Sequence, residues 1–393
     1  MALGIAVVAF LLTIVCDGLF THLPKLAGTP APGERIGVLH VHTKASCGSG
    51  TLPQVISAAK DANLSFLAVT DHNRAMSLAS VAAADPPEFA VIDGEEVSTS
   101  TGHFLALGLS DAWARGSGYD ARTLMASTRR AGAVNFIAHP FGLRDHWHEW
   151  ETPDYAGMEI WNDDAVWRQN NAFEVAIAFL LYPMNSRLAL LRLARTPSEN
   201  LAKWDELQQN RHVAGICGSD AHAALSVDNH VLARFPGYLS VFELIRQHVL
   251  LGNNADPDHA GADVILNALK QGHAFCAVDA LAPSDGFTQT VSASTSSGFS
   301  SVGPGDSIPY TPGATLHVAV PAGTPPATLR ILRDGHQITK RQTQSLDLAI
   351  PGPGHYRAEA YLRQPGLTGF GRWTLWVFAN PVTVTPLPND ASR

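Results

Sequence analysis

The chain has 393 residues, of which 46% are hydrophobic and 16% are charged, and its formal net charge is -8. This composition is typical of a packed globular protein, and the length favours two folded units over one. The negative charge argues against a protein that coats duplex nucleic acid, because that binding mode needs a basic face to displace counterions from the phosphates. A small phosphorylated ligand remains compatible with this charge.

The N-terminal segment predicts where the protein resides. Ala2 to Val15 is an apolar or near-apolar run, whose length of about 14 residues suits a signal-peptide core and falls short of a roughly 20-residue membrane span. No basic residue precedes the run, and no clear cleavage site follows it before the Pro- and Gly-rich stretch from Thr29 to Gly33. Cys16 ends the run like a lipidation cysteine, although Val15 is a poor residue before one. We expect residues 1–28 to be a signal peptide or membrane anchor, which would make the protein exported, periplasmic or anchored in the cell envelope.

Between Arg35 and about residue 280, short β-type runs alternate with helical stretches, as in parallel strands covered by helices. Strands are predicted at residues 36–39, 66–69, 89–92, 104–107, 134–138, 158–161 and 213–217. Helices are predicted at 52–62, 121–130 and 199–209, and also over 165–193, where Pro183 must break the helix. Residues 264–278 are predicted to form a helix and a strand that close this unit.

The pattern changes near Ala280. A stretch rich in Ser, Thr and Gly leads into alternating segments separated by the turn signals Asp334-Gly335 and Pro351-Gly352, without a helical period. This pattern predicts a small antiparallel β-sandwich over residues 285–393. Its histidines follow no common strand-end position, so we expect it to supply no metal ligand; they are His317, His336 and His355.

Histidines and carboxylates recur at the ends of the predicted strands in the first unit. All but His103, which opens the strand at 104–107, stand at or just after a C-terminal end, the edge that holds the active site in barrel and doubly wound folds. They are His40, His42, Asp71, His72, Glu95, Glu96, His103, His139, Asp220 and His222. One strand-end histidine alone is more often a structural residue than a ligand. The whole set, however, exceeds the three or four groups that one Zn, Mn or Fe ion takes, so two or three divalent ions are predicted. A carboxylate such as Glu96 can bridge two of them.

Five motifs of this set resemble, in order and spacing, the successive motifs of the PHP (polymerase and histidinol phosphatase) superfamily. They are His40-Val41-His42-Thr43, Thr70-Asp71-His72-Asn73, Gly94-Glu95-Glu96-Val97-Ser98, Ala138-His139-Pro140 and Gly218-Ser219-Asp220-Ala221-His222. The resemblance implies an α/β fold, a distorted (β/α)7 barrel over residues 34–283 followed by the β-sandwich module. It also implies hydrolysis of phosphoesters by a metal-activated water. Carried over by position, the resemblance implies three sets of ligands. The first ion would be held by His40, His42, Glu96 and Asp220. The second would be held by Glu96, His103 and His139, and His72 and His222 would form part of the third site.

One position departs from the family pattern. Many members have an acidic residue or a histidine shortly after the HxH pair as the remaining ligand of the third ion, whereas this chain has Ser46-Cys47-Gly48. Either Cys47 binds metal as a thiolate, which would favour Zn over Mn, or it fills space beside a two-metal centre. Both readings stay open at this point. The four cysteines are otherwise scattered and indicate no disulfide framework.

The expected activity is hydrolysis of a phosphomonoester or phosphodiester, with a nucleotide or short oligonucleotide among the candidate substrates. Glu96, Asp220 and Arg144 are the expected catalytic residues, and Arg144 is preferred over Lys44 and Arg74 because a guanidinium can grip phosphate with two bonds. One alternative keeps the metal site and cleaves C–N bonds, as an amidohydrolase does. Another is a non-catalytic envelope binding protein, but a scaffold without activity need not keep so many costly polar groups together.

Overall fold

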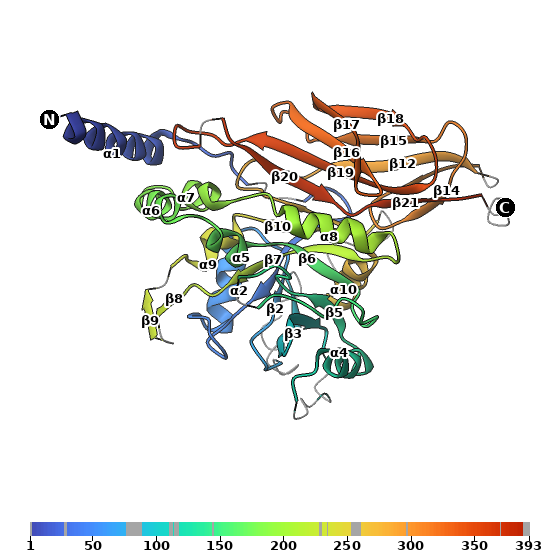
Figure 1. Ribbon diagram of the computed structural model, residues 1–393, viewed down its shortest axis with the longest axis horizontal. Coiled ribbons are helices and arrows are strands. Elements are labelled where there is room, and N and C mark those ends of the chain that lie inside the picture. Colours follow the sequence, from blue (N-terminus) through green and yellow to red (C-terminus); the bar gives the residue numbers. More distant parts are fainter. Residues whose placement is uncertain are drawn as a thin grey trace.

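A computed structural model describes residues 2–26, 30–75, 89–109, 113, 118–143, 145–227, 230–233, 235–252, 261–295, 298–369 and 371–387. The chain forms a barrel region and, stacked on it, a region of long antiparallel strands, with the N-terminal helix projecting from one end (Figure 1). The α/β barrel followed by an all-β sandwich is the fold class that the sequence predicts.

Seven strands close into the barrel, because β1 pairs with both β2 and β7. They are β1 (Glu34–Val41), β2 (Phe66–Val69), β3 (Ala90–Thr99), β4 (Gly102–Leu107), β5 (Val134–Ile137), β6 (Gly157–Asn162) and β7 (Ala214–Ala221). The barrel is distorted because β4 runs antiparallel to both of its neighbours. Antiparallel neighbours can be joined by a short hairpin, and β3 and β4 are joined in this way without a crossover helix.

The helices in the barrel region agree closely with the sequence pattern, and the break at Pro183 falls between α6 and α7. They are α2 (Leu52–Asp61), α4 (Ala121–Arg130), α5 (Asp163–Arg168), α6 (Ala172–Leu181), α7 (Ser186–Leu193), α8 (Ser198–Gln208), α9 (Tyr238–Phe242) and α10 (Ala262–Gln271). Proline stands in the first turn of α2, where its missing N–H has no helical partner to lose. A small hairpin, β8 (Leu225–Val227) with β9 (His230–Ala233), follows β7.

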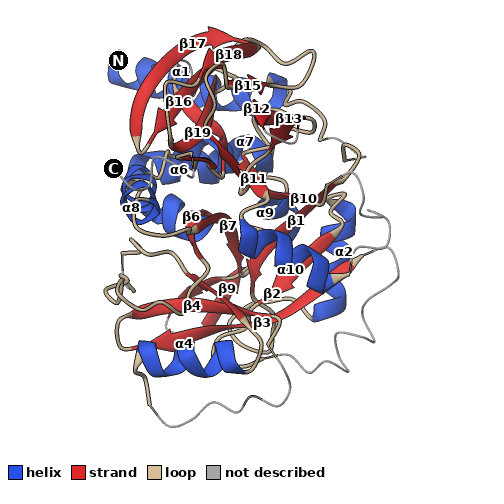
Figure 2. Ribbon diagram, turned by 90° about the vertical axis from the view of Figure 1, so that its right-hand side faces the viewer, coloured by secondary structure: helices blue, strands red, loops and turns tan. Residues whose placement is uncertain are grey.

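The C-terminal region has two facing groups of strands (Figure 2). One sheet has the order β13-β12-β15-β18, with β12 (Thr288–Thr295), β13 (Gly298–Val302), β15 (Thr315–Ala319) and β18 (Ser345–Ala349). The other group contains β14 (Ser307–Pro309), β16 (Ala327–Arg333), β17 (His336–Thr343), β19 (Gly354–Arg363), β20 (Trp373–Ala379) and β21 (Val382–Thr385). Alternating burial along β15 and β16 places one face of each strand in the core.

The second group is continuous with the barrel sheet, a link that the sequence pattern does not indicate. Strand β10 (Arg246–Leu250) pairs with β1, β11 (Ala274–Ala277) pairs with β10, and β20 pairs with β11. Asn380 strengthens the link: its side chain donates to the carbonyls of Gly215 and Ala274 and accepts from the Gly215 N–H. The boundary between residues 283 and 285 falls between β11 and β12, and independent folding of the two units stays a prediction.

A disulfide joins Cys217 on β7 to Cys276 on β11, and both residues are buried. The two cysteines are 59 residues apart in sequence, so their spacing carries no sign of the pairing. The expectation that the scattered cysteines form no disulfide framework is therefore corrected for this pair. Cys16 and Cys47 are free and exposed.

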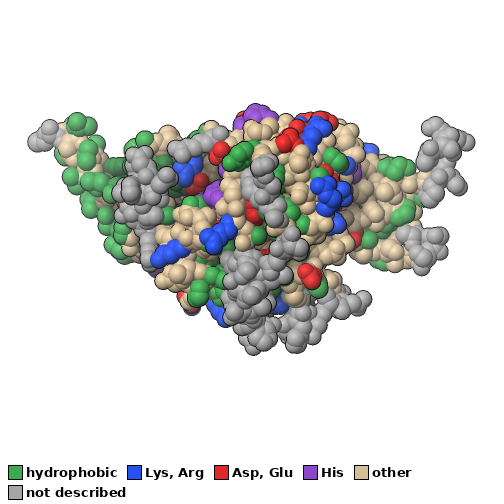
Figure 3. Space-filling model, turned by 90° about the horizontal axis from the view of Figure 1, so that it is seen from below, with side chains coloured by type: hydrophobic (Ala, Val, Ile, Leu, Met, Phe, Trp, Pro, Cys, Tyr) green, Lys and Arg blue, Asp and Glu red, His purple; other side chains and the backbone are tan. Residues whose placement is uncertain are grey.

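The N-terminal helix α1 (Ala2–Phe20) is long and apolar enough to cross a membrane by length and composition, and most of it is exposed. Its apolar side chains cover the projecting end of the molecule in the space-filling view (Figure 3). This helix is compatible with the predicted signal peptide or anchor.

Candidate metal centre

Three of the predicted ligands have a backbone conformation that is rare for residues other than glycine. His40, His139 and Asp220 have φ values of 62°, 25° and 46°, in the left-handed region that residues other than glycine rarely adopt. Strand β1 also shifts register between Val38 and Val41 against β2. Such conformations cost free energy and persist where the surrounding structure enforces them, which is common at functional sites. The distortion lies at the strand ends where the sequence places the ligands.

The first ligand group consists of His40, His42, Glu96 and Asp220, whose donor atoms lie within 4.8 Å of one another. Oε2 of Glu96 lies 3.1 Å from Nε2 of His40 and 3.2 Å from Nε2 of His42. Oδ1 of Asp220 lies 3.4 and 3.2 Å from the same two nitrogens. Both imidazole nitrogens and the Glu96 oxygen are fully buried without a hydrogen-bond partner. Buried, unpartnered donor atoms directed at one point fit a divalent cation.

The other oxygen of Glu96 faces a different pair of histidines. Oε1 lies 2.8 Å from Nδ1 of His103 and 2.9 Å from Nε2 of His139. Nδ1 of His72 lies 3.1 Å from Oε2 of Glu96, the oxygen that also faces His40 and His42. Each carboxylate oxygen thus meets its own set of imidazoles, which is the arrangement of a carboxylate that bridges two ions. Glu96 lies within β3, and not after that strand as the sequence pattern suggests.

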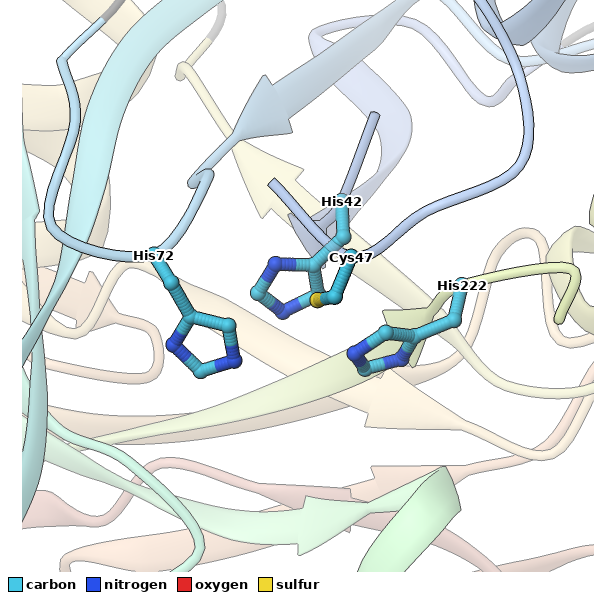
Figure 4. A group of neighbouring side chains, drawn as sticks. All are labelled: His42, Cys47, His72 and His222. Carbon is cyan, nitrogen blue, oxygen red and sulfur yellow. The ribbon is translucent and has the colours of Figure 1, made fainter. Parts of the chain in front are cut away.

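A second compact group contains Cys47. His42, Cys47, His72 and His222 also have donor atoms within 4.8 Å of one another. Figure 4 shows the sulfur of Cys47 in front of the His42 ring, with His72 and His222 on either side. The structure therefore brings Cys47 to the two histidines assigned to the third ion and adds His42, which the first group shares. One thiolate and three imidazoles form a donor set suited to Zn.

The carboxylates and histidines of the site shift one another's pKa values toward the charged forms. Burial disfavours the ionised carboxylates, yet His40, His103 and His139 hold the pKa of Glu96 well below its usual value. Asp220, also opposed by burial, has its pKa lowered by His40, His42 and His222. Burial likewise opposes imidazolium formation, but Glu96 raises the pKa of His139 to about 9. The carboxylates and imidazoles thus favour one another's charged forms, and a bound cation would take the place of imidazole protons.

The pKa of the Cys47 thiol is also shifted by neighbouring histidines against the effect of burial. Burial opposes its ionisation, but the neighbouring imidazoles of His222, His42 and His72 lower its pKa to about 4. The thiolate, and not the thiol, is the form of cysteine that binds metal. The neighbouring imidazoles thus favour the thiolate form of Cys47.

Behind the ligands lies a buried carboxylate that sequence reasoning missed. Oε1 of Glu159 lies 2.8 Å from Nδ1 of His40, and its Oε2 accepts hydrogen bonds from the His139 N–H and from Asn162. A side chain on Gly218 would place its Cβ 1.8 Å from Oε1 of Glu159, so the glycine leaves room for this acid. The only sequence signal is an acidic residue inside the apolar strand Met158 to Trp161. Such a residue is rarely fully buried without a partner.

Asp71 and Tyr238 hold the loop that carries Cys47. Asp71 accepts hydrogen bonds from the N–H and hydroxyl of Thr43 and from the Ser46 hydroxyl, at 2.8, 2.6 and 2.5 Å. The Tyr238 hydroxyl donates to the carbonyl of His42 at 2.7 Å. Asp71, a strand-end acid in the sequence, therefore positions the loop and is not in a ligand group among the described residues.

The basic residues expected at the substrate phosphate stay a prediction. Arg144 lies outside the described residues, and Lys44 and Arg74 are exposed on loops. Glu95 is buried on β3 next to Glu96, but consecutive side chains of a strand point to opposite faces. No sandwich histidine joins a ligand group in the described part of the chain.

A cavity of about 240 Å³ opens beside the centre. His139 and Asn162 line the side next to the ligands, and the first turn of α8 lines the other side with polar groups from Ser198 to Asn200. This volume could hold a small group next to the His139 side of the centre.

Comparisons with known proteins give structural neighbours only, since no family model and no curated protein matches the chain. A two-domain protein of Bacteroides vulgatus, described as containing a predicted PHP-like metal-dependent phosphoesterase, is 14% identical with a TM-score of 0.41. The match covers 91% of this chain and 98% of the Bacteroides protein. A protein of Bifidobacterium adolescentis, described as a predicted metal-dependent phosphoesterase, is 14% identical with a TM-score of 0.33. The match covers 50% of this chain and 90% of that protein.

A third neighbour is an amidohydrolase of Chromobacterium violaceum with bound sulfate and no metal. It is 15% identical with a TM-score of 0.34, and covers 47% of this chain and 87% of its own.

Proposed function

We propose that this protein is a metal-dependent phosphoesterase that hydrolyses a small phosphomonoester or phosphodiester. The observation that carries the proposal is the position of Glu96, whose two oxygens face separate sets of histidines at 2.8 to 3.2 Å. A bridged pair of ions suits phosphoester hydrolysis, because two adjacent cations can clamp both the attacking and the leaving oxygen of an in-line displacement.

Bound divalent ions would acidify a water and neutralise charge on the phosphoryl oxygens. The chain's own residues hold the site ready for this chemistry. Glu96 and Asp220 supply the negative charge that retains the cations, and the buried Glu159 orients His40 and the backbone of His139. Because these groups are buried and fixed by hydrogen bonds, little reorganisation is needed when substrate binds.

The cavity beside His139 and Asn162 is proposed to bind the leaving group of the substrate, which departs on the leaving oxygen when the P–O bond breaks. Its volume of about 240 Å³ and the polar residues in its mixed lining fit a small group with hydrogen-bonding atoms. A nucleotide or a short oligonucleotide end would place one residue there, while duplex nucleic acid is disfavoured by the net charge of -8. Arg144 is proposed to bind the phosphate, on the basis of its sequence position five residues after His139.

The proposed metal content is three ions, with Zn at the site that contains Cys47. Sulfur ligands favour Zn over Mn or Mg, whereas the group of His40, His42, Glu96 and Asp220 accepts Zn, Mn or Fe. The enzyme is further proposed to act in the cell envelope, to which the apolar helix α1 would direct it.

Metal analysis and an activity panel test this function. The full-length chain, stripped of metal and reloaded with Zn or Mn, should hydrolyse p-nitrophenyl phosphate or bis(p-nitrophenyl) phosphate and lose this activity with chelator. Cyclic amides and anilides should remain intact. Hydrolysis of the amides alone would contradict the phosphoesterase assignment and support the C–N hydrolase alternative, and a chain that binds no metal and turns over neither class would contradict both.

A further inference from the structure

Helices α1 and α6 together expose an apolar surface at one end of the molecule (Figures 1 and 3). The exposed side chains of α1 are almost all apolar, and they include Leu3, Ile5, Val8, Leu12 and Leu19. On α6, Phe173, Phe179 and Leu180 are 62%, 42% and 49% exposed. An exposed apolar patch of this kind marks a surface that meets a partner or a membrane.

The two helices pack against each other and form one surface. The ring of Phe10 in α1 stacks on that of Phe173 in α6, with centroids 5.5 Å apart. Ile14 is buried with Ala178 and Leu181 of α6 in a small core of its own. One side of α6 is thus filled by the body and α1. Leu180 lies on the side away from this core and is not covered by another element in the described part of the chain, and Phe173 stays 62% exposed beside Phe10.

A buried acid fastens the C-terminal end of α1 to the body. Asp17 is 1% exposed. It accepts hydrogen bonds from the backbone N–H groups of Leu367 and Thr368 at 3.0 and 2.8 Å, and it pairs with Arg192 of α7 at 3.3 Å. Gly366 makes the close approach possible, since a Cβ there would lie 2.0 Å from Oδ1 of Asp17.

This network gives a reason for α1 to stay attached. Removal of α1 would leave Arg192, which is 4% exposed, without its carboxylate. It would also leave the N–H groups of Leu367 and Thr368 without their acceptor. Breaking a buried ion pair by removing one partner is strongly destabilising, because the remaining charge stays buried. A leader peptide that is cut away has no need of such a connection.

We propose that α1 is retained and inserts into a phospholipid bilayer, and that the exposed face of α6 lies in the interfacial layer beside it. The apolar part of α1 ends at Cys16, directly before Asp17, and spans roughly 22 Å at 1.5 Å per residue. Asp17 then sits at the membrane surface, where Arg192 and the 366–368 loop hold the helix at a fixed orientation to the barrel. The proposal is independent of the metal chemistry.

Lipid contact can be measured on the full-length chain in phosphatidylcholine vesicles. Cys16→Ser and Cys47→Ser remove the two free cysteines, so an environment-sensitive fluorophore can be attached to Leu180→Cys alone. A matched control carries the label at Phe299→Cys on β13, which is 77% exposed in the sandwich. Spin-labelled phosphatidylcholine should quench the label at Leu180→Cys several-fold more than the label at Phe299→Cys. Equal, weak quenching at both positions would overturn the interfacial role of α6.

Two further measurements test the retained helix and its connection. The intact mass of the membrane-bound protein should include residues 2–20, and a protein that lacks them in its mature form would overturn retention. Asp17→Ala should keep vesicle binding but reduce quenching at Leu180→Cys, because α1 is no longer held at one angle. Unchanged quenching in Asp17→Ala would overturn the orienting role of Asp17.

Discussion

Glu159 lies behind His40, with its Oε1 2.8 Å from Nδ1 of the imidazole. This contact leaves Nε2 of His40 facing Glu96 and Asp220 at 3.1 and 3.4 Å. A carboxylate in this position sets the tautomer of a ligand histidine and makes it a stronger ligand. Because Oε2 of the same acid accepts the His139 N–H at 2.7 Å, one buried carboxylate orients ligands from both sides of Glu96.

Glu159→Gln is therefore expected to weaken metal binding roughly 10- to 100-fold, the usual cost of losing such a partner. The amide keeps the shape of the side chain but loses its charge. Competition with a chromophoric chelator measures the affinity, and Glu206→Gln on the exposed side of α8 is the matched control. Equal affinities in Glu159→Gln and the wild type would contradict the orienting role.

The catalytic prediction concerns the two neighbouring glutamates. Glu96→Gln and Asp220→Asn should each abolish phosphoesterase activity without unfolding the chain, because both acids lie in the ligand group with His40 and His42. Glu95→Gln should be far milder, since its side chain points to the other face of β3. Steady-state rates with metal in excess and circular dichroism check this. Equal loss of activity in all three variants would show that the bridging residue is wrongly assigned.

The candidate ligands could be singled out from the sequence because histidines and carboxylates recur near the ends of the predicted strands. The motif of His40 and His42 and the Asp220 motif carry this signal, and the structure brings them together with Glu96. Glu159 carries no such signal, because its role depends on the contact between β6 and β1 across the closed barrel. The same limit applies to Cys217 and Cys276, whose pairing depends on how β11 packs beside β7.

The barrel and sandwich could be predicted in outline, since alternation and turn residues indicate strands locally. The continuous sheet that joins the barrel to the sandwich could not be predicted, because the contact between Asn380 and Gly215 links residues that are 165 positions apart in sequence. Likewise, the apolar composition of α1 indicates a leader or an anchor, but the burial of Asp17 against the 366–368 loop appears only in the folded chain.

Cys47 is expected to bind metal through its thiolate. Its pKa of about 4, set by His222, His42 and His72 against the effect of burial, means that the sulfur is already anionic at neutral pH. Cobalt-loaded wild type should show a sulfur-to-metal charge-transfer band that Cys47→Ala lacks, and the variant should bind one ion fewer. Identical metal counts and spectra would show that Cys47 only fills space beside a two-metal centre.

The last prediction concerns His248, which is fully buried and belongs to none of the ligand groups among the described residues. Its Nδ1 lies 2.5 Å from Glu34 and its Nε2 lies 3.1 Å from Asp279. Burial opposes its protonation, but Asp279 and Glu34 raise the pKa of His248 to about 10. A group whose pKa is higher in the folded than in the unfolded chain stabilises fully below the unfolded value of about 6.5, and this stabilisation disappears as the pH rises through the folded value.

The free energy of unfolding should accordingly fall between about pH 6.5 and pH 10, by up to about 1.4 kcal/mol per pH unit from this group. Urea titrations at pH 6, 7.5 and 9 measure the change. His248→Gln should be less stable at pH 6, because Glu34 and Asp279 lose their buried counter-charge, and its stability should depend less on pH over this range. His317→Gln, whose parent histidine pairs with Asp347 on the exposed face of the sandwich, is the control and should keep the wild-type pH dependence. A pH profile of His248→Gln parallel to that of the wild type would mean that His248 is neutral in the folded protein.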